Sequence, residues 1–212
     1  MKLRLVDCQD SFTWNLVDLF AKKGAAVEVL EATSPLDALL SPGPDAWILS
    51  PGPGRPDDWP NLAELIEKLP LSIPILGVCL GHQAIGQFYG ATLKKDAPLH
   101  GESVSIHVTQ GRFFRDRDSQ FEAMRYNSLS LAAESCPEAL MWTALGSAGE
   151  VMALEHCSLP RFGLQFHPDS ILSPTGSLLA SRFIEIVRGI KAGNGSQLGL
   201  DSGTIRAHSS AG

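Results

Sequence analysis

Three residues of this 212-residue chain could act together as a nucleophile, a base and an acid: Cys79, His167 and Asp169. Cys79 stands between two glycines in Gly77-Val-Cys-Leu-Gly81, where a short apolar run gives way to a segment that can form a helix. This is the nucleophile-elbow pattern, with sulfur in place of the serine oxygen. A helix that starts at the cysteine directs amide groups and the positive end of its dipole toward the site, which favours a thiolate and a neighbouring oxyanion. The pattern predicts a reactive Cys79 rather than a structural cysteine.

A cysteine nucleophile needs a base, and the base needs an orienting partner. His167-Pro168-Asp169 directly follows the apolar run Phe162-Gly-Leu-Gln-Phe166, so it lies just past a predicted strand. The proline holds the backbone extended, which can point His167 and Asp169 toward a common place. The chain order Cys, His, Asp differs from the Ser, Asp, His order of α/β-hydrolases, which argues against an esterase.

Short apolar runs and helical spacing alternate through the first half of the chain. Strands are predicted at 3–6, 26–30, 46–50 and from residue 73, and helices at 12–20, 62–69 and 82–89. This order predicts an α/β fold, with a mostly parallel doubly wound sheet and helices on both faces. Pro51-Gly-Pro-Gly54 follows a predicted strand as a stiff loop with accessible amides, at the sheet edge where α/β proteins bind ligands.

The second half of the chain has a different pattern of polar and apolar residues. Polar and apolar residues alternate from 103 to 108, which predicts a half-exposed antiparallel strand. Further short strands at 151–154 and 162–166 predict a small antiparallel sheet, and a helix at 178–187 follows. Residues 189–212 are mostly Gly, Ser, Asn and single charges, so we expect one domain over residues 1–188 and a disordered tail over 189–212.

Composition limits the classes of function. Hydrophobic residues make up 44% of the chain and the formal net charge is −6, which predicts a globular protein and disfavours nucleic-acid binding. The start of the chain lacks the apolar core of a signal peptide, and no apolar run reaches membrane-spanning length. The four cysteines lack paired spacing, and the histidines and cysteines do not cluster as metal ligands. We therefore expect a cytoplasmic protein with reduced thiols, no metal and no membrane contact.

Six motifs occur in an order that resembles class I, triad-type glutamine amidotransferases. They are Asp10-Ser-Phe-Thr-Trp-Asn15, Ser50-Pro-Gly-Pro-Gly54, Gly77-Val-Cys-Leu-Gly-His-Gln83, His100-Gly101, Tyr126-Asn-Ser-Leu129 and Gly163-Leu-Gln-Phe-His-Pro-Asp-Ser-Ile-Leu172. The first motif resembles the subunit that serves chorismate enzymes, namely anthranilate synthase component II and its aminodeoxychorismate synthase counterpart. The resemblance extends from residue 5 to about 187 and implies a flavodoxin-like α/β fold.

The resemblance also implies a reaction and a partner. Cys79 would attack the side-chain amide of L-glutamine to form a γ-glutamyl thioester and ammonia, with His167 moving the proton and Asp169 orienting His167. The amides of Leu80 and of a glycine in the Gly52-Pro53-Gly54 segment, with Gly54 favoured, would form the oxyanion hole. Gln83 and the backbone around Ser128 and Leu129 would hold the amino-acid end of glutamine. Ammonia would pass to a chorismate-binding synthase subunit (component I), and the chain itself would need no cofactor.

Four motifs depart from the family pattern. The usual glutamate after His-Pro is Asp169, which is one methylene shorter; the usual lysine after His100-Gly101 is Glu102; and the usual histidine after Tyr126 is Asn127. The usual Asp-Asn-Tyr-Asp is Asp7-Cys8-Gln9-Asp10, and we interpret Cys8 as a small buried side chain after a strand. These changes leave two alternatives open: a stand-alone γ-glutamyl amidase or peptidase, and a non-catalytic regulatory subunit of a synthase. The sequence does not separate an anthranilate synthase partner (tryptophan biosynthesis) from an aminodeoxychorismate synthase partner (folate biosynthesis).

Overall fold

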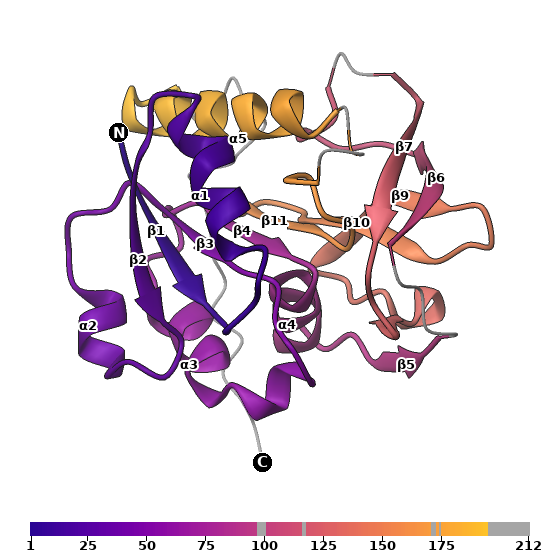
Figure 1. Cartoon of the computed structure of the whole chain (residues 1–212), viewed down its shortest axis with the longest axis horizontal. Helices are drawn as coiled ribbons and strands as arrows, with labels where there is room; N and C mark the ends of the chain where they lie inside the picture. The colour runs from indigo at the N-terminus through magenta and orange to yellow at the C-terminus, as the bar shows by residue number, and fades with distance from the viewer. Residues whose placement is uncertain (97–100, 116–117, 171–172, 174, 195–212) are drawn as a thin grey trace.

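One large mixed sheet runs through the protein (Figure 1). The computed structural model describes residues 1–96, 101–115, 118–170, 173 and 175–194. The strands are β1 (Lys2–Asp7), β2 (Ala26–Glu31), β3 (Ala46–Leu49), β4 (Ile75–Val78), β5 (Leu93–Lys95), β6 (Glu102–Val108), β7 (Gln120–Arg125), β8 (Leu129–Leu131), β9 (Leu140–Gly146), β10 (Val151–His156) and β11 (Arg161–Leu164). Nine of them form the sheet in the order β2-β1-β3-β4-β11-β10-β9-β6-β7, and β5 and β8 pair separately.

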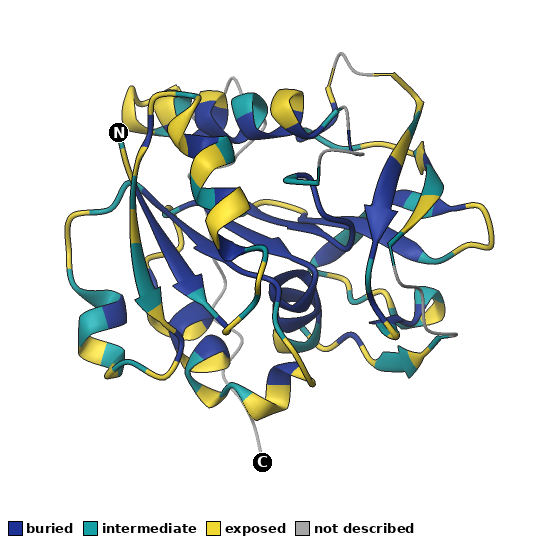
Figure 2. Cartoon of the chain, viewed as in Figure 1, coloured by how far each residue is buried: buried dark blue, intermediate teal, exposed yellow. Residues whose placement is uncertain are grey.

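The first five strands of that order are parallel and carry helices on both faces. The helices are α1 (Thr13–Ala21), α2 (Leu36–Leu40), α3 (Pro60–Lys68), α4 (Leu80–Phe88) and α5 (Gly176–Lys191), with short 3₁₀ turns η1 (Pro56–Asp58) and η2 (Ala133–Ser135). One buried cluster packs α1 and α5 against one face, through side chains such as Phe20 and Phe183. A second cluster packs α2, α3 and α4 against the other face, through Leu39, Leu65 and Ile85 (Figure 2). This arrangement confirms the predicted doubly wound α/β fold.

The antiparallel strands mostly extend the same sheet. Strands β10, β9, β6 and β7 continue it beyond β11 with antiparallel pairing throughout. The small separate antiparallel sheet consists of β5 and β8 alone. The periodicity within a strand predicts which of its faces is exposed but not which strand it pairs with. The sequence therefore did not predict that the antiparallel strands continue the parallel sheet.

Several element boundaries differ from their predicted positions. The helix after Cys79 begins at Leu80 rather than at residue 82, and α2 lies in a segment for which the sequence predicts a loop. Helix α5 continues to Lys191, three residues beyond the predicted end of the folded part. Of the predicted tail, residues 195–212 lie outside the described part of the chain. Within the described ranges, no helix has both the length and the apolar character needed to cross a membrane.

The topology brings four segments of the chain to one edge of the sheet. Strands β1, β3, β4 and β11 are parallel neighbours, so their carboxyl ends point the same way. The segments that follow them begin at Cys8, Ser50, Cys79 and Gln165. The chain reverses its winding direction between β1 and β3, and a crevice at such a switch point is the usual ligand site of this architecture.

Candidate active site

Cys79 occupies a strained turn between β4 and α4. Its φ of 52° and ψ of −103° lie in a region that non-glycine residues rarely adopt. A Cβ atom on Gly77 would meet the backbone of Gly81, and one on Gly81 would meet the carbonyl oxygen of Leu49, so both flanking positions need glycine. The Cys79 amide donates to the Leu164 carbonyl at 2.8 Å, which ties the turn to β11. The turn therefore has the predicted strand–elbow–helix geometry.

The surroundings of the Cys79 thiol favour its neutral form. Burial, and to a smaller extent the negative charge of Asp10, raise its pKa to about 12. The Leu80 amide and the more distant Arg125 guanidinium act in the opposite direction. Without substrate, Cys79 is therefore a neutral thiol, and its ionisation depends on a base and on hydrogen-bond donors at the sulfur.

His167 and Asp169 meet at the end of β11, as the sequence predicted. Nδ1 of His167 lies 3.7 Å from Oδ1 of Asp169, and both side chains are buried. That separation exceeds a hydrogen bond, and neither atom has a hydrogen-bond partner of ordinary geometry within the described residues. The His167 backbone amide donates to the Met124 carbonyl at 3.0 Å, which fixes the segment against β7. The carboxylate of Asp169 thus lies beside the imidazole of His167 but does not form a hydrogen bond with it.

Two aromatic rings enclose the imidazole of His167. The ring centroids of Phe12 and Tyr126 lie 5.0 Å and 4.9 Å from that of His167, both in edge-on geometry, and 4.9 Å from each other. Burial lowers the pKa of His167 to about 4, so the imidazole is neutral near pH 7. A neutral imidazole can accept a proton from Cys79, and Nε2 is the nitrogen available for this because Nδ1 faces Asp169.

Burial also controls the ionisation of Asp169. It raises the pKa of this carboxyl to about 7, and the charge of Asp10 adds to the effect, whereas Asn15 beside the carboxyl lowers it. Asp169 and Ser170 line an open cavity of about 460 Å³ that also reaches Phe12, Asn15 and Tyr126. The cavity therefore borders Asp169, although the side chain of Asp169 itself is 0% exposed.

The Pro51–Gly54 loop packs directly against the elbow. A Cβ on Gly52 would lie 2.6 Å from Cδ2 of Leu80, so only glycine allows this approach. Gly54 has a φ of 76°, which glycine adopts without strain. The indole N–H of Trp59 donates to the Pro53 carbonyl at 3.1 Å and holds the far side of the loop. Gly52 thus packs against Leu80, the residue after Cys79, and the oxyanion role of Gly54 stays a prediction.

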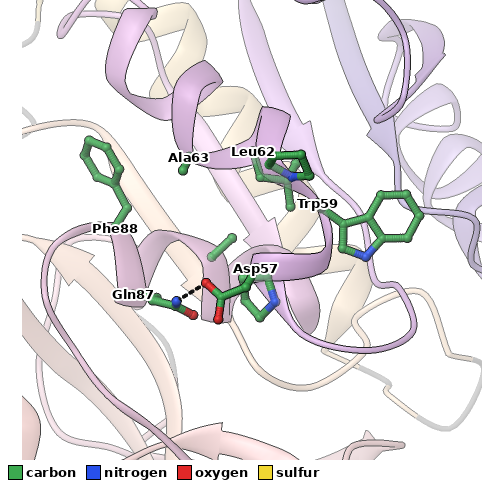
Figure 3. A pocket seen from close by; sticks show the side chains of 9 residues that line it. Asp57, Trp59, Leu62, Ala63, Gln87 and Phe88 are labelled. Carbon is green, nitrogen blue, oxygen red and sulfur yellow. Dashed lines mark hydrogen bonds between the residues drawn. The ribbon is translucent and has the colours of Figure 1, made fainter.

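A second pocket lies behind this loop, between η1, α3 and the end of α4 (Figure 3). It has a volume of about 380 Å³, and the side chains of Trp59, Leu62 and Phe88 line it together with Asp57 and Gln87, which are hydrogen-bonded to each other. None of the predicted catalytic side chains lines it. The pocket is therefore separate from Cys79, His167 and Asp169.

Gln83 is hydrogen-bonded to the Ser128–Leu129 segment, with which the family resemblance associates it. Its Nε2 donates to the Leu129 carbonyl at 2.8 Å, and Nδ2 of Asn127 donates to the same carbonyl at 2.6 Å. Ser128 is exposed, and its carbonyl accepts from the Asp96 amide at 2.9 Å. Because the Nε2 hydrogens of Gln83 are used inside the protein, Oε1 is the side-chain atom left to accept a bond from a ligand.

Two buried residues near Cys79, Gln165 and Arg125, were assigned no role from the sequence. Gln165 donates from Nε2 to Sγ of Cys79 at 3.7 Å, and its Oε1 accepts from Gln83 at 3.1 Å. Arg125 is 1% exposed, donates to Asn127 and forms an ion pair with Glu150 at 2.9 Å. A polar residue within an otherwise apolar run was the available signal for Gln165.

The departures from the family pattern fall at different distances from the site. Asn127 is buried and bonded, whereas Glu102 is exposed at the start of β6. Cys8 is fully buried, as interpreted from the sequence. His100, Ile171 and Leu172, which belong to the motifs quoted above, lie outside the described part of the chain. In the portions that are described, no group of three His, Cys, Asp or Glu side chains could hold a metal ion.

Residues 4–186 match the family model of class-I glutamine amidotransferases, so the chain belongs to this family. It is 39% identical to anthranilate synthase component 2 of Azospirillum brasilense over 88% of this chain and 96% of that protein. It is 36% identical to aminodeoxychorismate/anthranilate synthase component 2 of Bacillus subtilis, over 87% of this chain and 96% of that protein. It is 37% identical to aminodeoxychorismate synthase component 2 of Klebsiella aerogenes, over 85% of this chain and 97% of that protein.

A solved structure supports the fold alone. It comes from Thermoplasma acidophilum and is described as one of the subunits of GMP synthase. The TM-score is 0.81 at 21% identity, with 91% of this chain and 96% of that chain covered.

Proposed function

We propose that this protein is the glutaminase subunit of a chorismate-aminating synthase. It would hydrolyse L-glutamine through a thioester on Cys79 and deliver ammonia to a component I subunit. The observation that carries the proposal is Cys79 itself, strained at the elbow of a class I glutamine amidotransferase with His167 and Asp169 at the neighbouring strand end. The relatives named as synthase component 2 support the choice of partner.

The first half of the reaction forms the thioester. Nε2 of His167 accepts the thiol proton while Sγ of Cys79 attacks the side-chain carbonyl carbon of glutamine. The carbonyl oxygen becomes an oxyanion, and the Leu80 amide together with a glycine amide of the Pro51–Gly54 loop stabilises it. Such donors contribute roughly 3 kcal/mol each in comparable sites. The tetrahedral species then collapses, the C–N bond breaks, and His167 returns its proton to the leaving ammonia.

The second half regenerates the enzyme. His167 removes a proton from a water molecule that attacks the thioester carbon, the C–S bond breaks, and glutamate leaves with Cys79 as a thiol. Asp169 stabilises the imidazolium in both halves, which requires its ionised form. Gln83 would use Oε1 to accept a hydrogen bond from the α-ammonium group of glutamine.

A direct test measures ammonia release from glutamine by the wild type and by Cys79→Ala, each with and without a component I subunit. The proposal expects wild-type turnover that Cys79→Ala lacks, and stoichiometric labelling of Cys79 by an electrophilic glutamine analogue. Equal activity of the two proteins in both settings would refute it. Activity that needs no partner would favour a stand-alone γ-glutamyl amidase. Addition of chorismate then separates anthranilate from aminodeoxychorismate as the product of the complex.

A further inference from the structure

Gln165 is a polar side chain in the most buried part of the site. It lies one residue past β11, is 0% exposed, and donates its backbone amide to the Met152 carbonyl at 2.9 Å. Neighbouring residues of the same segment have assigned roles, because Leu164 anchors the amide of Cys79 and His167 is the proposed base. A buried glutamine needs partners at both ends of its amide.

The partners of Gln165 determine which way its amide points. Oε1 accepts from Nε2 of Gln83 at 3.1 Å, and a Gln83 N–H can only meet the oxygen end of another amide. Nε2 of Gln165 is thereby directed at Sγ of Cys79, at 3.7 Å, within the range for a hydrogen bond to sulfur. The second hydrogen of Gln83 is held by the Leu129 carbonyl at 2.8 Å, so Gln83 cannot turn its amide over without losing both bonds.

We propose that Gln165 is a further catalytic residue, whose side-chain N–H stabilises the Cys79 thiolate and links the nucleophile to the glutamine-binding residue Gln83. This inference rests on the proposed function, in which Cys79 attacks and Gln83 binds glutamine. The physical need for such a donor is evident, because burial strongly opposes ionisation of the thiol. A donor that lies in contact with the sulfur offsets part of that cost, and its orientation is set before substrate arrives.

The same contacts give the residue a second effect. Gln165 supplies one of the two acceptors that hold the Gln83 amide, so it sets the position of the atom that remains for glutamine. Substrate binding and thiolate formation would then depend on one buried amide. The two effects can be separated, because the oxygen of Gln165 serves Gln83 and the nitrogen serves Cys79.

Two substitutions at position 165 make this separation. Gln165→Met keeps the length of the side chain and removes both polar ends. Gln165→Glu keeps an oxygen for Gln83 and replaces the N–H donor by a carboxylate. Gln110→Glu is the matched control, because Gln110 is exposed and its substitution introduces the same charge away from the site.

The first readout needs no glutamine. The rate of Cys79 alkylation by iodoacetamide is measured between pH 7 and 9.5 and followed by peptide mass spectrometry, which separates Cys79 from the other three cysteines. A hydrogen bond to a charged group corresponds to roughly tenfold in the thiolate population. We expect Gln165→Met to react about tenfold more slowly than wild type at pH 8, Gln165→Glu more slowly still, and Gln110→Glu at the wild-type rate.

The second readout is the kinetics of glutamine hydrolysis. Gln165→Met is expected to raise KM and lower kcat, because both links are lost. Gln165→Glu is expected to lower kcat with KM within about threefold of wild type. Alkylation rates of both variants within twofold of wild type would overturn the proposal. If neither variant melts cooperatively, Gln83→Met provides the test, because release of the Gln165 amide should also slow alkylation, and an unchanged rate would overturn the proposal.

The outcomes also distinguish this inference from the proposed function. A chain without glutaminase activity but with slowed alkylation in the Gln165 variants would refute the function and keep the donor role. A chain with Cys79-dependent glutaminase activity and unchanged alkylation in those variants would keep the function and remove Gln165 from the mechanism.

Discussion

Replacement of Asp169 by glutamate should make the enzyme faster. Oδ1 of Asp169 stops 3.7 Å from Nδ1 of His167, about 0.9 Å beyond a normal charge-assisted hydrogen bond. One added methylene lengthens the side chain by about 1.5 Å, which is enough to close that gap. A cavity of about 460 Å³ borders Asp169 on the side of Asn15 and Tyr126.

The size of the gain follows from what Asp169 already contributes. A hydrogen bond to a charged group contributes about 1.5–3 kcal/mol, but a carboxylate at 3.7 Å already supplies part of this through its charge. A net gain of about 1–1.4 kcal/mol corresponds to a five- to tenfold increase in kcat. Asp169→Asn, which keeps the shape and removes the charge, should lower kcat by roughly 10²-fold or more.

The assay is ammonia release at saturating glutamine, with wild type, Asp169→Glu and Asp169→Asn measured between pH 6 and 8.5. Burial holds the pKa of Asp169 near 7, so wild-type kcat should rise through this range as the carboxyl ionises. A closer contact with the imidazolium should favour the ionised acid and move the rise to lower pH in Asp169→Glu. A folded Asp169→Glu protein with kcat equal to or below wild type would refute the reasoning that the gap limits the rate.

Three further perturbations test other parts of the structure. Gly81→Ala places a Cβ against the Leu49 carbonyl oxygen of β3, so it should lower the free energy of unfolding by about 2–3 kcal/mol and abolish labelling of Cys79 by the glutamine analogue. Thermal melting and mass spectrometry measure the two effects, and a stable, fully labelled variant would contradict this prediction. Burial lowers the pKa of His82 to about 3 and of His156 to about 4, so the unfolded chain binds more protons than the folded one below pH 6.5. These two histidines should therefore lower Tm as pH drops from 6.5 toward 4, and His82→Gln should make that fall smaller; identical Tm profiles for wild type and His82→Gln would contradict this. Trp59→Phe removes the N–H bond to the Pro53 carbonyl and should lower kcat about fivefold with little change in Tm, and an unchanged kcat would exclude a role for this bond in holding the loop.

The sequence predicted the parallel half of the fold well because each of its signals is local. Apolar runs mark β1, β3 and β4, and helical spacing marks α1 and α3 close to their observed bounds. The β9 to β10 hairpin and its union with β11 depend on pairings between residues far apart in the chain, which a pattern along one strand does not encode. Helix α2 has only five residues, which is too few for a repeating apolar pattern to indicate a helix.

In the site, too, the features that could be predicted are those that depend on a few neighbouring residues. The elbow position of Cys79 and the proximity of His167 to Asp169 could be predicted, because a cysteine between glycines and a histidine beside an acid are each visible over a few residues. The 3.7 Å gap between His167 and Asp169 could not be predicted, since it depends on how the segment after β11 packs against β7, where the His167 amide donates to the Met124 carbonyl. A shorter acid in the sequence shows only that a methylene is absent, and the fold decides whether the backbone compensates for it. Here a separation of 3.7 Å between Nδ1 of His167 and Oδ1 of Asp169 remains.

Gln165 shows most clearly why a list of reactive residue types is incomplete. Within an apolar run it has the pattern of a strand residue, and its importance arises from where its two amide ends lie. One end meets Gln83 on α4 and the other meets the sulfur of Cys79, so the residue connects two positions that the sequence treats as independent. Burial opposes ionisation of the Cys79 thiol, and a donor in contact with the sulfur offsets part of that cost. The elbow therefore supplies the strain and the position of the nucleophile, and its ionisation depends on the neighbouring strand.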